Sequence, residues 1–251
     1  MSDHSPPIRI VVPAHQSDHV IHECLCHLLA AVPRLPNWEI VVVDNGGHSI
    51  SLTEQLAVLP LEVRPRVLKS SAAYARNEGA RDFREGILVF VDSDVMIEPR
   101  CLEILLEPIL MGEAAATVGN YSSEVAGLNF AQQYKQLYIH HMYRQQGQQL
   151  RNDFWTAISA ILARDFHEDT EFADANGEDQ EMGIRMEDKG KSVFPVPQAQ
   201  GKHLHHYTVR KLMGNDLRKG LTALHNSYHN QVPLADNRHA RSDSIFAVAL
   251  A

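Results

Sequence analysis

The sequence has no long apolar run, few cysteines and no excess of basic residues. No apolar stretch approaches the roughly 20 residues that a membrane-spanning helix needs. The formal net charge of −8 disfavours nonspecific binding to nucleic acid or anionic lipid, although a local basic patch could overcome it. The N-terminal segment also lacks the basic start and apolar core of a signal peptide. We therefore expect neither a transmembrane segment nor a nucleic-acid partner.

The cysteines form no recognisable framework. There are three, Cys24, Cys26 and Cys101, and an odd count of this kind favours a reducing compartment, so we expect a cytoplasmic location. Cys24 and Cys26 are too few for a zinc site and lack the two-residue gap of a redox pair. With 44% hydrophobic and 22% charged residues in 251, the composition is that of a globular chain, expected to form a single domain over residues 1–251.

Strands and helices alternate through the first half of the sequence. Strands are expected at residues 9–12, 39–43, 66–69, 87–91 and 114–120, and helices at 19–32, 52–59, 72–83 and 99–111. Pro13 is expected to end the first strand. This alternation implies βαβ units with right-handed crossovers, so the predicted fold class is α/β with a mostly parallel sheet.

The second half follows a different pattern. A long, mostly polar helix is expected at 126–149, a strand at 154–163, a helix at 179–189, a last strand at 193–196 that Pro197 ends, and a helix at 208–220. The segment after residue 202 is rich in histidine, lysine and arginine. Its basic residues could meet phosphate headgroups or an anionic acceptor, which would allow peripheral contact with the inner membrane face, but such a face is more often simply solvated.

Two carboxylates at one strand end are the most informative feature. Asp92 and Asp94 follow the short apolar run at 87–91 directly. In an open α/β sheet, ligands bind at the carboxyl ends of the strands. Carboxylates so close repel each other unless a cation lies between them, and a hard divalent ion suits oxygen ligands. A nucleoside diphosphate would supply further oxygens. By itself, the tripeptide is also typical of a turn or a helix cap.

Four more segments stand with this pair in a fixed order. They are Val-Pro-Ala-His at 12–15, Val-Val-Val-Asp-Asn-Gly at 41–46 and Ala-Arg-Asn-Glu-Gly at 75–79 before it, and a Gly-Glu-Asp sequence at 177–179 follows at the start of a helix. In this order the segments resemble the family-2 glycosyltransferases, which have the GT-A fold. The resemblance covers roughly residues 8–220. Met182 and Ile184 stand near positions where the family often has leucine or another apolar residue, which is a conservative change.

The resemblance implies an inverting transferase that moves a sugar from a nucleotide-diphosphate sugar to a hydroxyl. A UDP-sugar is the favoured donor, although GDP- and dTDP-sugars occur in the family. The acceptor, whether saccharide, lipid or small molecule, stays open. Residues 8–120 would form the half that binds nucleotide sugar and metal, and residues 121–220 the half with the acceptor and the catalytic base. Residues 221–251 would be a C-terminal extension.

The resemblance also implies the residues that bind the donor. Asp44 would accept a hydrogen bond from the base, Arg76 would lie near the diphosphate or ribose, and Asp92 would bind the ribose. The remaining donor contacts would come from Pro13, Ala14, His15 and Ser93. As alternatives, Asp44 could be a turn residue before Asn-Gly, and His15 and Arg76 could be surface residues.

For the metal, the resemblance implies Asp94 as the direct ligand and Asp92 as a ligand through water. His203 would complete the protein's share, with His205 and His206 as close rivals in the same histidine-rich stretch. Either Mg²⁺ or Mn²⁺ would serve as the cofactor, and a histidine nitrogen would favour Mn²⁺.

The catalytic base implied by the resemblance is Asp179, with Glu178 as the alternative base or an orienting partner. The base takes the proton of the acceptor hydroxyl as it attacks the anomeric carbon from the face opposite the diphosphate. The same two residues are also typical of favourable first-turn charges of a helix. Trp155 stands where the family often has acceptor-site residues and could stack on a sugar ring, or it could be a core residue.

Two other function classes remain to be weighed. A nucleotidyltransferase of the same fold usually carries a glycine-rich loop after the first strand, and residues 12–17 contain no glycine. A non-catalytic module that binds a nucleotide sugar or a partner would keep the fold without the reaction. Consumption of a UDP-sugar in the presence of metal separates these classes from a transferase.

Overall fold

The computed structural model describes residues 5–47, 51–65, 71–144, 153–168, 171–172 and 178–230. Its strands are β1 (Ile8–Ala14), β2 (Trp38–Asp44), β3 (Glu62–Arg64), β4 (Ile87–Val91), β5 (Val95–Ile97), β6 (Ala116–Tyr121), β7 (Ile158–Leu162) and β8 (Val193–His203). Its α-helices are α1 (Ile21–Ala31), α2 (Leu52–Gln55), α3 (Ala72–Ala80), α4 (Cys101–Leu110), α5 (Phe130–Arg144), α6 (Ala163–His167), α7 (Glu178–Asp188) and α8 (Val209–Asn230). The strand expected at 66–69, the end of the helix expected at 126–149, and residues 231–251 lie outside the described residues.

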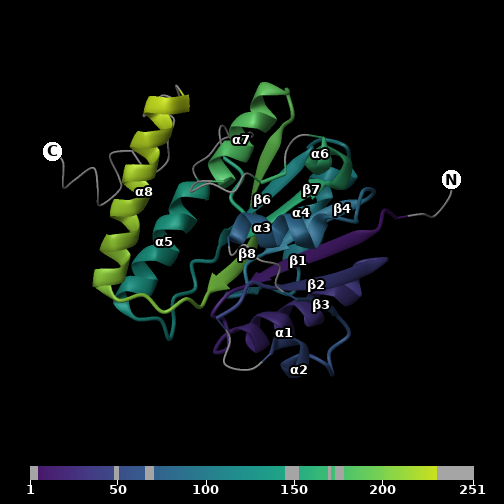
Figure 1. Cartoon of the computed structure of the whole chain (residues 1–251), viewed down its shortest axis with the longest axis horizontal. Helices are drawn as coiled ribbons and strands as arrows, with labels where there is room; N and C mark the ends of the chain where they lie inside the picture. Colours follow the sequence, from purple (N-terminus) through teal and green to yellow (C-terminus); the bar gives the residue numbers. More distant parts are fainter. Residues whose placement is uncertain are drawn as a thin grey trace.

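All the described strands join one eight-stranded sheet in the order β3-β2-β1-β4-β7-β6-β8-β5. The four strands from β3 to β4 are parallel to one another, and β6 and β8 form a further parallel pair. β7 is antiparallel to both its neighbours, and β5 is antiparallel to β8. The prediction of an α/β fold with a mostly parallel sheet is confirmed. Figure 1 shows α5 and α8 side by side, away from the end of the sheet that holds β3.

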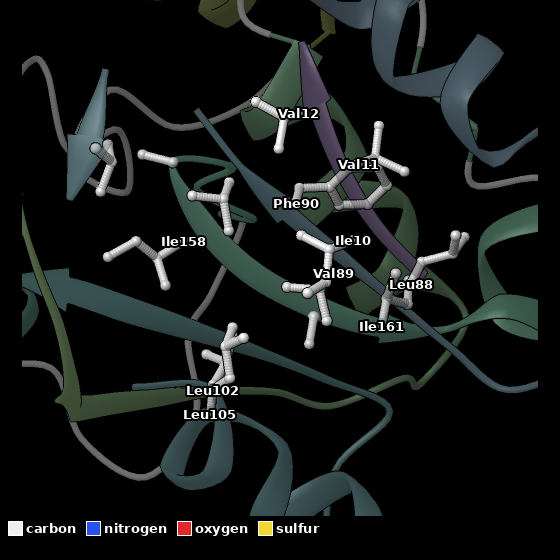
Figure 2. Packing of buried hydrophobic residues seen from close by; sticks show 14 of the residues in the cluster. Ile10, Val11, Val12, Leu88, Val89, Phe90, Leu102, Leu105, Ile158 and Ile161 are labelled. Carbon is white, nitrogen blue, oxygen red and sulfur yellow. The ribbon is translucent and has the colours of Figure 1, made fainter. Parts of the chain in front are cut away.

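The core lies around the central strands of this sheet. Every residue of β1 and of β4 is buried, and this is why β4 is apolar at every position and β1 is apolar except at Arg9. Figure 2 shows β1 and β4 side chains close together, with Ile158 and Ile161 of β7 nearby and side chains of α4 on one side. Because β1 and β4 are packed in this core, the residues that follow their carboxyl ends are held in fixed positions.

The first strand does not end at Pro13, as the sequence predicted, but continues to Ala14. Ile8 and Ala14 both bond toward the β2 side of β1, so the odd-numbered Pro13 faces the β4 side. The pairing of β1 with β4 ends at Val11, and the missing N–H of Pro13 therefore costs no sheet hydrogen bond. Pairing with β2 continues and sets Ala14 opposite Asp44.

The last strand also runs beyond its predicted end at Pro197, to His203. Both prolines of β8 come before its pairing with β5, which begins at Gly201, so neither has to donate a hydrogen bond to that strand. β5 itself was not expected from the sequence. Its pairing sets Val95 opposite His203, and this register brings the end of β8 beside Asp94.

Further elements differ from their predicted extent, among them α2, which ends at Gln55 and not at 59, and α5, which begins at Phe130 and not at 126. The apolar segment at 154–163 is not one strand, because only Ile158–Leu162 forms β7 and the short helix α6 follows at once. The chain turns where the backbone N–H of Ala163 donates to Gly86 at the start of β4. The helix expected at 208–220 is longer and reaches Asn230, so part of the predicted 221–251 extension continues α8.

Candidate active site

The ends of β1 and β2 bring two of the predicted donor segments together. The backbone N–H of Asn45 donates to the carbonyl of Ala14 over 2.7 Å, and the ring Nδ1 of His15 lies 3.0 Å from the Asn45 carbonyl. Asp44 accepts a hydrogen bond of 2.7 Å from the Gly46 N–H, which is the Asx-turn expected before Asn-Gly. Pro13 and Ala14 are buried, whereas His15 is exposed beside the turn.

The Asp92–Asp94 segment forms a tight turn between β4 and β5. The N–H of Asp92 donates to the carbonyl of Ala157, and the N–H of Val95 donates back to the carbonyl of Asp92 over 3.0 Å. Ser93 is buried inside this turn. The two carboxylates are partly exposed, Asp92 by 30% and Asp94 by 23%.

Arg76 links the two acidic motifs of the site. Its guanidinium lies 2.7 Å from Asp92 Oδ1 and 3.2 Å from Glu178 Oε1, although Arg76 and Glu178 are 102 residues apart in sequence. The side chain is only 4% exposed. Burial lowers the pKa of Arg76, but the charges of Asp92 and Glu178 outweigh burial and raise it, so the guanidinium stays charged. Arg76, which was predicted to lie near the diphosphate or ribose, thus bridges the carboxylates of Asp92 and Glu178.

Asp94 meets two of the three candidate histidines. Its Oδ2 lies 3.3 Å from His203 Nε2 and 3.4 Å from His205 Nδ1. Burial alone would raise the pKa of Asp94, but His203 and then His205 hold it well below its usual range, so the carboxylate is ionised. His206 is exposed.

An aromatic stack supports the His203 ring from behind. Tyr121 stacks on His203 with ring centroids 5.0 Å apart, and Trp155 meets Tyr121 edge-on at 4.7 Å. Trp155 also stacks on Tyr143, with ring centroids 5.0 Å apart. Trp155 is 9% exposed, so most of its ring surface is used in this stack. Its predicted contact with an acceptor sugar stays a prediction.

A row of side-chain amides along one side of α5 holds the backbone that carries the histidines. Asn129 donates to the carbonyl of Tyr207 over 3.0 Å, and Gln132 donates to the carbonyl of His205 over 3.1 Å. Gln136, 1% exposed, accepts a hydrogen bond of 3.1 Å from the N–H of His203. Residues three and four apart share one face of a helix, so the spacing of the amides at 129, 132 and 136 was a signal in the sequence, which the description as a polar helix missed.

Replacing Gln136 by leucine is expected to weaken Mn²⁺ binding about 10–100-fold, the range typical of residues that orient a metal ligand. Leucine fills similar space but leaves the N–H of His203 without its acceptor. Mn²⁺ affinity can be measured from the electron paramagnetic resonance signal of free Mn²⁺, titrated in the presence of UDP.

The matched control is Gln133→Leu, the same change on the outer face of α5, where the glutamine bonds only within its own helix region to the Leu128 carbonyl. This variant should bind Mn²⁺ as the unaltered protein does. Gln136→Glu retains an acceptor oxygen and should recover part of the loss. A folded Gln136→Leu protein with unchanged Mn²⁺ affinity would show that the amide row has no part in metal binding.

The start of α7 carries the two candidate bases. The carbonyl of Asp179 accepts a hydrogen bond of 3.1 Å from the N–H of Phe154, and its Oδ1 accepts one of 2.9 Å from the N–H of Gln180. The pKa of Glu178 is raised, because burial and the charge of Asp179 outweigh the lowering effect of Arg76. The two carboxylates therefore differ in surroundings, with Glu178 turned to Arg76.

A glycine allows α7 to lie close to the segment before β7. A Cβ on Gly183 would lie 2.2 Å from the backbone nitrogen of Asp153, so no other residue fits without movement of the chain. Tyr143 donates a hydrogen bond of 2.6 Å to Asp153 Oδ2 from the α5 side. This packing and the hydrogen bond from Phe154 to the Asp179 carbonyl hold the start of α7 against residues 153–154.

The side chains of the site that could bind a metal fit a divalent cation. Within the described residues, no three acidic, histidine or cysteine side chains already form a complete ligand set. Asp94 with His203 or His205 offers one carboxylate oxygen and one imidazole nitrogen, a combination that suits Mn²⁺ when phosphate oxygens and water fill the other positions.

The fold has the features of a GT-A glycosyltransferase. An acidic turn follows the central strand β4, and α7 begins with two carboxylates. The family model for glycosyl transferase family 2 matches residues 9–169. The chain belongs to this family, as its sequence motifs predicted.

Two relatives have related sequences. Glycosyltransferase GlyG of Streptococcus pneumoniae serotype 4 is 30% identical over 118 residues, which cover 45% of this chain and 38% of GlyG. Glycosyltransferase GlyA of the same organism is 30% identical over 121 residues, which cover 46% of this chain and 17% of GlyA. The chain thus matches less than half the length of either relative.

Solved structures share the fold. The mannosyltransferase PcManGT from Pyrobaculum calidifontis, in complex with GDP-Man and Mn²⁺, has a TM-score of 0.68 at 15% identity, covering 98% of this chain and 71% of its own. GalNAc-T7 with UDP, GalNAc and Mn²⁺ has a TM-score of 0.61 at 15% identity, covering 82% of this chain and 44% of its own. At such identities the likeness shows the fold alone.

Proposed function

We propose that the protein transfers a sugar, with inversion, from a nucleotide-diphosphate sugar to an acceptor hydroxyl in a reaction that needs a divalent metal. The observation that carries this is the meeting of Asp94 with His203 at the end of β4, next to the link from Arg76 to Asp92. Family membership supports the reaction class. Two structural neighbours hold a nucleotide or nucleotide sugar together with Mn²⁺, which supports the donor class and the metal.

The nucleotide would lie over the ends of β1 and β2. Asp44 would accept a hydrogen bond from the base, and a uracil N–H suits this acceptor, so we favour a UDP-sugar. Pro13, Ala14 and His15 would line the same pocket, because the register of β1 and β2 puts them next to Asp44. Asp92 would bind the ribose hydroxyls while Arg76 fixes the orientation of its carboxylate. Ser93 would shape the turn.

Asp94 and His203 would hold the cation, with His205 as the alternative nitrogen ligand and Asp92 acting through water. When bound, the metal neutralises the charge that develops on the departing diphosphate. The nitrogen ligand favours Mn²⁺ over Mg²⁺. The β5–β8 pairing and the amides of α5 keep these side chains in position before the donor arrives.

Asp179 would take the proton from the acceptor hydroxyl, a contribution of about 10²–10⁴-fold in rate. Glu178 would act through Arg76, which ties it to the donor side. Residues 8–120 would then be the donor half and residues 121–220 the acceptor half, with Trp155 in the wall between them. The acceptor would be a saccharide, a lipid or a small molecule.

The cysteines support the proposal that the protein is located in a reducing, cytoplasmic compartment. All three are free, and two of them, Cys24 and Cys101, are buried. Burial raises the pKa of both buried thiols, which keeps them in the unreactive thiol form. None of them takes part in the proposed reaction.

Nucleotide binding tests the proposal most directly. UDP, GDP, dTDP and CDP are added separately, each with and without Mn²⁺, and thermal unfolding is followed. A ligand at about 100 times its dissociation constant stabilises the folded state by roughly 2.7 kcal/mol, so we expect a rise of several degrees in Tm with UDP and Mn²⁺ together. Slow release of UDP from a UDP-sugar should accompany it.

Other outcomes assign the chain elsewhere. Stabilisation by UDP and Mn²⁺ without any consumption of UDP-sugars, even with added saccharide acceptors, would favour the non-catalytic binding module. If no nucleoside diphosphate changes Tm with or without metal, the proposal is wrong and the family motifs reflect ancestry only.

A further inference from the structure

Helix α8 exposes an apolar stripe between residues 209 and 221. Val209, Met213, Leu217 and Leu221 recur every fourth residue, and each is between 50% and 58% exposed. Side chains at this spacing lie on one side of a helix. Single exposed apolar residues are ordinary on protein surfaces, but a continuous row of large ones marks a contact surface.

Helix α5 adds a second apolar surface next to the first. A groove of about 470 Å³ on its outer side is lined by Phe130, Gln133, Tyr134, Leu137, Tyr138 and His141. Phe130 is the most exposed aromatic side chain of the set, and Tyr134 and Tyr138 stack on each other with centroids 6.1 Å apart. Tyrosine rings suit a boundary between water and an apolar phase.

The two helices run side by side and in the same direction (Figure 1). Asp216 of α8 lies 3.6 Å from Lys135 of α5 and also raises the pKa of Tyr134 through its charge, after the larger effect of burial. Counting about 100° per residue from these contacts, the stripe of α8 and the groove of α5 face the same side of the helix pair. We call this surface, made of the stripe and the groove, the α5–α8 face.

The charge of the helix pair is opposite to that of the chain. Acidic residues are absent from the α5 sequence, and α8 has only Asp216, which is paired with Lys135. The basic residues of the two helices are Lys135, Arg144, Arg210, Lys211, Arg218 and Lys219. In sequence, basic residues therefore outnumber the one acidic residue of α5 and α8, whereas the chain as a whole has a formal net charge of −8.

We propose that the α5–α8 face binds the surface of an anionic lipid bilayer, with both helices lying along the interface. An apolar side flanked by basic residues is the pattern of helices that lie in the headgroup region. No helix in the described part of the chain is long and apolar enough to cross a bilayer. A second copy of the chain is a poorer occupant, because the contact would bring the same basic residues together.

Vesicle co-sedimentation tests the proposal with the full chain and without nucleotide or metal. Vesicles of phosphatidylcholine alone are compared with vesicles of phosphatidylcholine and phosphatidylglycerol. We expect binding to the anionic vesicles and at least about tenfold weaker binding to the neutral ones. Raising salt from about 0.1 M to about 1 M shortens the Debye length from about 10 Å to about 3 Å and should release most of the bound protein.

Two pairs of variants separate the apolar from the basic contribution. Met213→Glu/Leu217→Glu should lose vesicle binding, while Val58→Glu/Met111→Glu, the same chemical change at exposed apolar residues of other elements, should not. Arg210→Glu/Lys211→Glu should also lose binding, and Arg81→Glu/Arg84→Glu, at exposed arginines beyond α3, should retain more of it.

The outcomes decide between occupants. Equal binding of all variants, or no binding to anionic vesicles at low salt, overturns the proposal. A dimer in sedimentation velocity that Met213→Glu/Leu217→Glu abolishes, without vesicle binding by the unaltered protein, assigns the face to a second copy instead. Because the assay contains no donor, its result does not depend on the proposed transferase activity, and UDP binding by the α8 variants should be unchanged.

Discussion

Asp94→Asn is expected to lower turnover about a thousandfold, equivalent to about 4 kcal/mol of lost transition-state stabilisation, and to remove the Mn²⁺ dependence of UDP binding. The substitution keeps the size of the side chain and an oxygen that can still face His203 and His205. It removes the negative charge that the two histidines now stabilise. Turnover is measured as UDP released from a UDP-sugar, and binding as the change in Tm with UDP and Mn²⁺.

The control for this experiment is Asp82→Asn, the same change at a carboxylate that forms ion pairs away from the candidate site. Asp82 pairs with Arg9 and Arg64, whose hydrogen bonds lower its pKa to about 2 against the opposing effect of burial. Its loss should reduce stability without altering the response to UDP and Mn²⁺. If Asp94→Asn retains full metal-dependent binding, Asp94 is not the metal ligand.

Asp179→Asn is expected to lower turnover by about 10²–10⁴-fold while leaving the affinity for UDP and Mn²⁺ nearly unchanged. An amide retains the hydrogen bond that Oδ1 accepts from the Gln180 N–H, so the start of α7 should stay folded. It cannot take the proton of an acceptor hydroxyl. The separation of turnover from nucleotide binding distinguishes a base from a residue that holds the donor.

Glu178→Gln is the informative comparison, because it neutralises the adjacent carboxylate instead. The substitution weakens the contact with Arg76 and so loosens Asp92, and we expect its main effect on KM for the donor. If Glu178→Gln abolishes turnover and Asp179→Asn does not, the roles are reversed and Glu178 is the base. The raised pKa of Glu178 would then need to be matched to the pH profile of the reaction.

The sequence alone determined the fold class and indicated the edge of the sheet where the candidate site lies. The run at 87–91 coincides with β4 because a strand buried on both faces must be apolar at every position, which is a local and readable pattern. The carboxylates of Asp92 and Asp94 followed from that position, because parallel strands share one carboxyl edge. The family motifs fixed the class of enzyme through their order along the chain.

The tertiary structure decided which side chains meet. His203 reaches Asp94 because β5, a three-residue strand, pairs with the end of β8, and neither a strand so short nor a strand that contains two prolines has a clear sequence signal. His205 joins the same carboxylate, while its neighbour His206 is exposed, so composition could not separate the three histidines.

Arg76 and α5 also show the difference between what the sequence indicates and what the tertiary structure decides. The motif around Arg76 indicated a phosphate partner, but burial of the guanidinium brought in Asp92 and Glu178, because a buried charge needs partners of opposite charge. The amides of α5 looked like a solvated face, yet they hold the backbone of residues 203–207. Local patterns are set by neighbours along the chain, and these contacts depend on segments far apart in sequence, whose meeting only the packing of the whole chain determines.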